Sequence, residues 1–344
     1  TSRLSTVSDL GVISRTSAMQ YEKTNKSLKE IGQELGVDYV LEGSIRWSRS
    51  AENSKVRVTP QLVRVSDDTQ VWSSIYDRVI NDVFQVQTEI AQNVITQLGI
   101  TLLKNQQATL TEEPTQNVEA YEAYLRGFQN VQSASYDESM FLSGIQNFEQ
   151  AVKLDPNFAL AYSHLAITHL RFFHEGYDVS SERLATAKKM IDRAIELKPN
   201  LPEARIALGY YHYYGFQNYD LALQELRAST NASPNNSEGL AAIAYVERRE
   251  GKFEDSIHQL NKLLELDPRN ANHPTNIAVT LTRIRRYAEA EVFLNRAIGL
   301  EPGQVYIYGM KQLNSVLWKG DLKESRSILE NMPQKDPAFS DLFW

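Results

Sequence analysis

Three histidines, His164, His169 and His174, follow one another at intervals of five residues. Imidazole side chains gathered at one place could bind a metal ion or transfer protons. On a helix, however, a step of five residues leaves successive side chains about 140° apart, so the three rings do not share a face. The spacing argues against a common site, and we interpret these histidines as packing residues.

The sequence also lacks the short motifs that build common catalytic sites. It has no zinc-binding H-E-x-x-H, no EF-hand loop, no Walker A loop, no G-x-S-x-G and no G-x-G-x-x-G. Cysteine is absent, which excludes disulfides, thiolate zinc sites and cysteine nucleophiles. The paired carboxylates Glu112 and Glu113 stand before Pro114, a context typical of a linker. We therefore expect this chain not to be an enzyme and to hold no cofactor and no metal.

A repeat in the sequence predicts the helices that position the other candidate residues. Prolines recur at intervals of 34 or 35 residues after a first interval of 43, at Pro156, Pro199, Pro234, Pro268, Pro302 and Pro337. A period near 34 is typical of helix–turn–helix solenoids. Because proline is excluded from helix interiors, each one is expected to mark the end of a helix pair.

At two further positions, each a fixed number of residues before the proline, every repeat has the same type of residue. We call these two sets of residues columns. Twelve residues before each proline stands a small residue, as a close helix crossing requires: Gly144, Ala187, Ala222, Ser256, Ala290 and Ser325. Eight residues before it stands a large apolar residue: Phe148, Ile191, Leu226, Leu260, Leu294 and Leu329. The agreement of these columns predicts that residues 118–339 are almost entirely helical.

The first helix of each pair supports a resemblance to a known repeat family. One such helix reads Tyr162-x2-Leu165-Ala166-x2-His169, and the others follow the same spacing. Together with the small residues and the prolines, this resembles the tetratricopeptide (TPR) pattern over roughly residues 118–339. The resemblance implies a right-handed solenoid of about six repeats that binds protein or peptide partners.

The resemblance also places a binding groove. In TPR repeats, fixed positions of each first helix line the inner surface, and here they correspond to Ile167, Arg171, Ile206, Tyr210, Tyr213, Tyr214, Tyr245, Arg248, Arg249, Val279 and Arg283, with Asn314 and Trp318 in the sixth repeat. Tyrosine and arginine are frequent binding anchors, so we predict a groove for a segment with apolar and acidic residues. The alternative, that Tyr210, Tyr213 and Tyr214 pack between repeats, stays open at this point.

The first hundred residues have a different pattern. Residues 27–35 and 83–103 read as amphipathic helices, and Leu41, Ile45 and Trp47 alternate with polar residues as in a half-buried strand. We therefore predict an α+β amino-terminal domain over 1–104, a linker over 105–117, an all-α solenoid over 118–339, and a tail over 340–344. The two helices are expected to cover the sheet that contains the alternating strand.

Three stretches of this first domain resemble the TolB-amino-terminal-like domain: residues 35–44, 61–65 and 70–78. That family opens with a strand and most of a helix that have no counterpart here, so we expect one edge of the sheet to be open. In bacteria the domain often precedes TPR repeats and follows a class III nucleotide cyclase, a CadC-like winged-helix regulator or a kinase. The resemblance thus implies a non-catalytic interaction and scaffold segment of a signalling protein, with any catalytic domain upstream.

Composition limits the partners. The net charge of −7 and the isoelectric point near 5.5 argue against general nucleic-acid binding. No apolar run is long enough to span a membrane. A protein or peptide partner is expected, which could be another domain of the same protein or a second copy. By analogy with membrane-anchored relatives we expect the periplasmic side of a membrane, with the cytoplasm as the alternative.

Overall fold

The structure is a computed structural model that describes residues 4–7, 9–22, 24–48, 55–79, 83–102, 104–133, 137–320 and 322–332. The chain divides into two compact units. Unit 1 comprises Thr1–Val12 and Ser27–Ala242, and unit 2 comprises Ile13–Lys26 and Ile243–Trp344. The division falls inside one helix, α11 (Ser237–Arg249).

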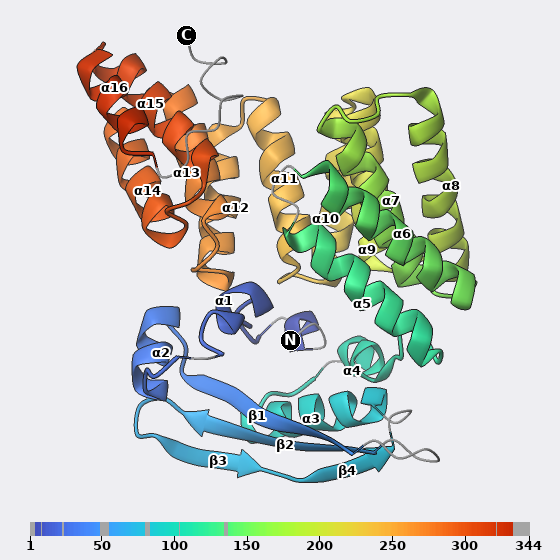
Figure 1. Ribbon diagram of the computed structural model, residues 1–344. Coiled ribbons are helices and arrows are strands. Elements are labelled where there is room, and N and C mark those ends of the chain that lie inside the picture. The colour runs from blue at the N-terminus through green and yellow to red at the C-terminus, as the bar shows by residue number, and fades with distance from the viewer. Residues whose placement is uncertain are drawn as a thin grey trace. The chain divides into compact units, whose positions relative to one another are not determined.

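Unit 1 begins with an antiparallel sheet near the amino terminus (Figure 1). Its central strand is β2 (Lys55–Arg64), which pairs along one side with β1 (Tyr39–Ser48) and along the other with β3 (Thr69–Ser73) and β4 (Tyr76–Val79). Among the described residues, β1 pairs with β2 alone, so its outer edge has no strand beside it. The resemblance implies an open edge where the family's first strand would pair, and which edge of this sheet that is stays a prediction.

Helices cover one face of this sheet. The helix α3 (Val83–Gln97) packs its Ala91, Val94 and Ile95 against Leu62 of β2, and Leu110 of α4 (Lys104–Thr111) joins the same core. The helix α3 ends earlier than the predicted 103, because Gly99 adopts a left-handed φ of 68°. The segment predicted as a linker thus contains α4.

The other predicted helix is α2 (Leu28–Leu35). A capping box between Ser27 and Glu30 starts it, and Gly36 ends it at a φ of 67°. Gly32 of α2 lies directly against the Val65 side chain, so α2 packs at the end of β2.

The expectation that Leu41 and Ile45 lie beneath these helices is wrong. Leu41 is opposite Leu62 in the register and therefore shares its face, yet Leu41 is 40% exposed and Ile45 59% exposed. The helix α3 packs against β2, β3 and β4, and leaves Leu41 and Ile45 of the edge strand β1 exposed. Trp47 lies in β1, and its side chain is outside the described part of the structure.

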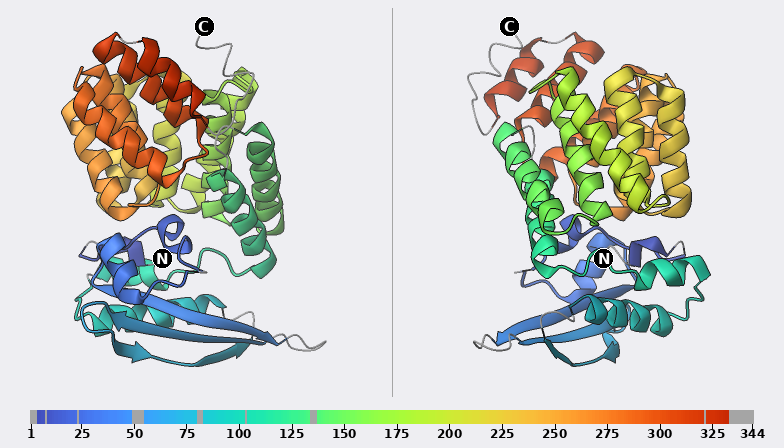
Figure 2. Two further views of the ribbon diagram at one scale, coloured as in Figure 1. Left: turned by 60° about the vertical axis from the view of Figure 1, so that its left-hand side comes forward. Right: turned by 90° about the vertical axis from the view of Figure 1, so that its right-hand side faces the viewer.

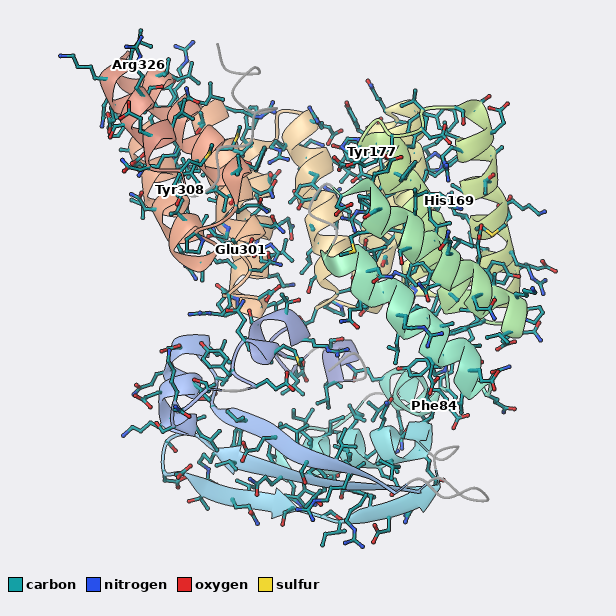
Figure 3. All side chains as sticks on the ribbon, viewed as in Figure 1. Phe84, His169, Tyr177, Glu301, Tyr308 and Arg326 are labelled. Carbon is teal, nitrogen blue, oxygen red and sulfur yellow. The ribbon has the colours of Figure 1, made fainter. Side chains whose placement is uncertain are left out.

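The rest of unit 1 is helical. After the short η1 (Leu4–Thr6), α2, α3 and α4, the chain continues as α5 (Val118–Ser133), α6 (Glu138–Leu154), α7 (Ala159–His174), α8 (Ser181–Leu197), α9 (Pro202–Tyr210), the π-helix η3 (Tyr211–Gly215), α10 (Tyr219–Ala232) and the start of α11. An edge-to-face contact between Phe84 of α3 and Tyr121 of α5, with ring centroids 4.7 Å apart, joins α3 to the first helix pair (Figure 3).

Unit 2 contains the short α1 (Arg15–Met19) and the remaining helices, α12 (Phe253–Leu266), α13 (Asn272–Arg283), α14 (Tyr287–Leu300), α15 (Val305–Lys319) and α16 (Leu322–Glu330). Successive helices of each unit stack as antiparallel pairs (Figure 2). No described residue between 157 and 332 forms a strand, as predicted.

The repeat columns have the predicted roles. The helices α6, α8, α10, α12 and α14 each end two residues before a column proline, and Pro337 lies outside the described residues. All six small residues of the first column are buried, and so are the large apolar residues up to Leu294. A mostly helical, repeat-built chain with a small antiparallel sheet near its amino terminus is therefore confirmed.

Candidate peptide-binding groove

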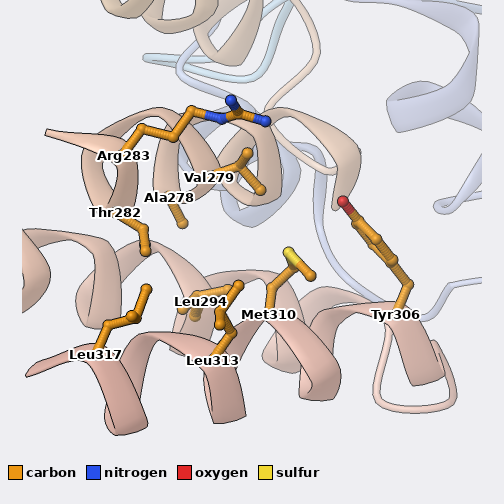
Figure 4. A pocket seen from close by; sticks show the side chains of 9 residues that line it. All are labelled: Ala278, Val279, Thr282, Arg283, Leu294, Tyr306, Met310, Leu313 and Leu317. Atoms are coloured by element: carbon orange, nitrogen blue, oxygen red, sulfur yellow. The ribbon is translucent and has the colours of Figure 1, made fainter. Parts of the chain in front are cut away.

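A pocket of about 310 Å³ lies in unit 2 between α13, α14 and α15 (Figure 4). It is lined by Ala278, Val279, Thr282, Arg283, Leu294, Tyr306, Met310, Leu313 and Leu317. The side chains of Val279 and Met310 face each other across it, while Arg283 and the Tyr306 hydroxyl lie at its rim (Figure 4). The lining is therefore apolar inside with one cation at the edge.

Helical spacing creates this surface. Tyr306, Met310, Leu313 and Leu317 recur at steps of three or four residues and so form one stripe along α15. Leu313 is 40% exposed and Leu317 is 51% exposed. Single exposed leucines are ordinary, but two of them beside a pocket make this surface a candidate for binding.

A buried amide holds the two helices of the groove in place. Asn314 is fully buried, accepts a hydrogen bond of 2.9 Å from the Thr282 hydroxyl and donates one of 3.1 Å to the carbonyl of Tyr287. These bonds fasten α15 to α13 and to the start of α14. These bonds hold the lining of the pocket in place, and a preformed lining lowers the ordering cost of any binding.

Of the residues predicted for the groove, those in unit 2 lie on neighbouring first helices. The Arg248 guanidinium stacks 5.4 Å from the Tyr245 ring centre and donates a hydrogen bond of 3.1 Å to the Asn276 side chain of α13. Tyr245, Arg248 and Val279 are half-buried. Arg249 and Arg283 are exposed, so their charges face solvent.

The predicted residues of unit 1 are mostly enclosed. Ile167, Ile206, Tyr210 and Tyr213 are all buried, which leaves little of these side chains for a partner. The Tyr210 and Tyr214 rings stack 4.9 Å apart and are nearly parallel, at 6°.

The stack continues beyond Tyr214. The His174 ring lies 4.0 Å from the Tyr214 ring, at 18°, and Arg171 lies over the Phe141 ring at 5.2 Å. Arg171 and Tyr214 are half-buried. In unit 1 the rings therefore pack mainly on one another, which is the alternative that the sequence left open.

The pocket is lined by Tyr306, Leu313 and Leu317, whereas the residues predicted on the same helix are Asn314 and Trp318. Asn314 is buried as the anchor described above, and Trp318 does not line the pocket. The repeat contains a signal for these lining residues, because Leu313 and Leu317 stand one 34-residue period after Val279 and Arg283.

The histidines have packing roles. Burial lowers the pKa of His164 to about 4, and its ring lies among those of Tyr124, Phe128 and Phe148. Burial, and secondly the nearby Arg183, lower the pKa of His169 to about 4, with the Arg183 Nη1 2.8 Å from its Nδ1 (His169 is labelled in Figure 3). No cluster of three or more metal-ligating side chains occurs among the described residues.

Comparison with known proteins identifies the repeats. The model of the tetratricopeptide repeat family matches residues 241–305, which include α12 and α13. These residues are TPR repeats. The crystal structure of PilW, a widely conserved type IV pilus biogenesis factor, shares this fold with a TM-score of 0.50 and 12% identity, over 66% of this chain and 99% of that one.

Two curated proteins are similar in sequence. A candidate adenylate cyclase of Rhizobium meliloti (strain 1021) is 28% identical over 206 residues, which cover 60% of this chain and 34% of the relative. A peroxisomal targeting signal receptor of Eremothecium gossypii is 23% identical over 186 residues, which cover 46% of this chain and 32% of the relative. The TPR chain thus spans about a third of the length of each relative.

Proposed function

We propose that the groove between α13 and α15 binds a peptide segment of a protein partner, and that the segment carries a large apolar side chain close to a carboxylate. The pocket of Figure 4 supports this proposal: its interior is apolar, and the exposed Arg283 stands at its rim. An arginine fork binds a carboxylate through two parallel hydrogen bonds.

The size of the pocket favours a side chain over a cofactor. Small-molecule sites usually enclose roughly 300–1,000 Å³ and bury most of the ligand. At about 310 Å³ this pocket is at the low end of that range, and it opens onto the exposed Leu313 and Leu317. Anchoring by one or two apolar side chains, with the rest of the segment lying along α15, fits these dimensions.

We further propose that the chain is a non-catalytic scaffold segment of a larger bacterial signalling protein. The similarity to a candidate adenylate cyclase supports this, as does the resemblance of residues 35–44, 61–65 and 70–78 to the TolB-amino-terminal-like domain. The alternatives are the regulatory half of a class III nucleotide cyclase or kinase whose catalytic domain lies upstream, and the sensor part of a winged-helix regulator. A periplasmic location is part of the proposal. Among the described residues no helix is long and apolar enough to cross a membrane.

Peptide selection tests the binding proposal. Display of random peptides against the purified full chain should enrich sequences that combine Leu, Phe or Trp with Asp or Glu. Leu317→Asp places a carboxylate in the apolar stripe of the groove, where it faces the apolar anchor of the peptide and competes for Arg283, and it should weaken binding of the selected peptides at least about tenfold.

A matched control separates groove binding from a general surface effect. Val292→Asp introduces the same charge on α14 at a residue that is 66% exposed and does not line the pocket, so it should leave binding unchanged. Equal affinity of the peptides for Leu317→Asp and for the wild type, with both proteins folded, would refute the groove. Enrichment of basic peptides would refute the role of Arg283.

A further inference from the structure

A second set of contacts in unit 2 involves the turn between α12 and α13. The segment Ile13–Lys26, far away in sequence, lies on this turn and contains the helix α1. The backbone N–H of Ser14 donates a hydrogen bond of 2.8 Å to the carbonyl of Leu266, the last residue of α12. Ser14 also caps α1 by accepting a hydrogen bond from the N–H of Ser17.

The centre of the contact is a buried carboxylate. Asp267 is only 4% exposed, and one of its oxygens accepts hydrogen bonds from the hydroxyls of Ser14 and Ser17. Its other oxygen accepts a bond of 2.9 Å from the Asn270 side chain and lies 3.6 Å from His273 Nε2. Burial raises the pKa of Asp267, but these hydrogen bonds outweigh burial and hold it below its usual range.

Ser17 is recognised from two sides. It is fully buried, donates its hydroxyl proton to Asp267 and accepts a hydrogen bond of 2.9 Å from the N–H of Arg269. A hydroxyl satisfies both groups because it is a donor and an acceptor at once. Alanine would leave the Arg269 N–H unpaired, and a carboxylate would repel Asp267.

The edge of the contact adds specificity. The Gln20 amide and Arg269 form two hydrogen bonds, from Gln20 Nε2 to the Arg269 carbonyl at 3.2 Å and from Arg269 Nε to Gln20 Oε1 at 2.9 Å. The Arg269 guanidinium also lies 5.7 Å from the centre of the Tyr21 ring. The turn thus contacts four side chains of the segment, which are spaced as Ser-x2-Ser-x2-Gln-Tyr.

The same chemistry recurs at another Asp-Pro turn, in unit 1. There the Thr115 hydroxyl donates to Asp155, and the Asn117 amide donates a bond of 3.1 Å to the carbonyl of Leu154. In both units a hydroxyl binds the aspartate and an N–H binds the carbonyl of the preceding leucine. This repetition indicates a mode of recognition that belongs to the Asp-Pro turn itself.

We propose that the α12–α13 turn is a second peptide-binding site, separate from the groove, which recognises a short segment with the Ser-x2-Ser-x2-Gln-Tyr pattern. The chain's own Ser14–Tyr21 is its ligand in this structure. The helix α1 has five residues, far fewer than an isolated helix needs for stability, so the site supplies its order. A segment ordered only by its site is able to leave it and be replaced.

The experiment uses the full chain with Ser17→Asp, which should expel the segment by charge repulsion at Asp267. Thr16→Ala is the matched control, because Thr16 is an exposed neighbour on the same helix. Amide hydrogen exchange over residues 13–21 should be slow in the wild type and in Thr16→Ala. It should be at least about tenfold faster in Ser17→Asp, since local opening then needs little free energy.

A labelled peptide of residues 13–26 completes the test. It should bind the Ser17→Asp protein saturably and bind the wild type far more weakly, because there the tethered segment fills the site. The same peptide with Ser17→Asp should not bind either protein. Equal exchange rates in wild type and Ser17→Asp would overturn the proposal, and so would equal binding of the two peptides. Protection that rises with protein concentration would assign the ligand to a second copy and overturn the intramolecular assignment.

Discussion

Replacing Asn314 with alanine tests whether its amide builds the groove. The substitution removes the acceptor of the Thr282 hydroxyl and the donor to the Tyr287 carbonyl; Asn314 itself is fully buried, and Thr282 and Tyr287 are half-buried. The Thr282 hydroxyl can turn to another acceptor, whereas the carbonyl cannot move without disturbing α14. One buried group without its partner costs about 1–3 kcal/mol, so we expect a loss of that order in the local stability of α13, α14 and α15.

Hydrogen exchange measures this loss where it occurs. A loss of about 1–3 kcal/mol corresponds to roughly 5- to 150-fold faster exchange of amides that open with this part of the chain. Peptides from α13, α14 and α15 should show the acceleration. Peptides from α7 in unit 1 serve as a control within the same molecule, because the change affects unit 2 alone.

A double substitution tests the attribution to hydrogen bonding. Thr282→Val alone leaves the Asn314 oxygen without its donor, and in the double variant with Asn314→Ala both partners of that bond are gone. The double variant should therefore lose less stability than the sum of the single variants. Strict additivity, or less than about twofold acceleration in Asn314→Ala, would show that this amide does not hold the helices together.

Two further predictions concern the repeats of unit 1. Ala222→Leu should destabilise the protein by about 1–3 kcal/mol in urea denaturation, because Ala222 is fully buried where α9 and α10 cross so closely that a Cβ on Gly209 would lie 3.3 Å from the Ala222 carbonyl oxygen. The change Leu221→Ala, at an exposed neighbour, should alter stability little. The pKa of His164 is about 4 in the folded state against 6.5 unfolded, so the unfolded state binds the proton first and stability falls as pH drops from about 6.5 to 4. His164→Phe should reduce this loss of unfolding free energy by about 1–3 kcal/mol, measured by urea denaturation of variant and wild type at pH 6.5 and at pH 4. If both proteins lose the same unfolding free energy between these pH values, His164 is not the group that titrates.

The repeat architecture was accessible from sequence because it rests on local rules applied many times. A proline ends a helix wherever it stands, and a small residue is needed wherever two helices cross closely. Both rules act at each of the repeats, so their periodic signal accumulates. The boundaries of α8, α10, α12 and α14 follow from it directly.

The groove residues of unit 1 were harder to predict because a helix there departs from regular α geometry. The predicted positions assume a continuous α-helix through Tyr210, Tyr213 and Tyr214, but Tyr211–Gly215 forms a π-helix. A π turn takes in an extra residue and rotates the positions that follow it. This repeat is also one residue longer between prolines than the two after it. Tyr213 consequently packs inward.

Which strands of the sheet are covered by helices could not be predicted from the sequence, for a different reason. Alternation identifies a strand and its two faces, but it does not say how far a helix layer extends across neighbouring strands. Leu41 and Leu62 share one face, but α3 packs against Leu62 of β2, Trp72 of β3 and Tyr76 of β4, and Leu41 on the edge strand β1 stays exposed. An edge strand with exposed apolar residues is the result.

The contact of Ser14 and Ser17 with Asp267 joins residues about 250 positions apart and leaves no periodic trace in the sequence. Serines, glutamine and tyrosine are common surface residues, and only the geometry shows that one buried carboxylate organises them. The turn and the groove differ in chemistry: Asp267 demands hydroxyl donors, whereas the apolar stripe of α15 with Arg283 favours an apolar and acidic segment. A single ligand would not satisfy both, because a carboxylate that suits Arg283 is repelled at Asp267. The two binding proposals are therefore independent, and Leu317→Asp and Ser17→Asp should each abolish one mode of binding and leave the other intact.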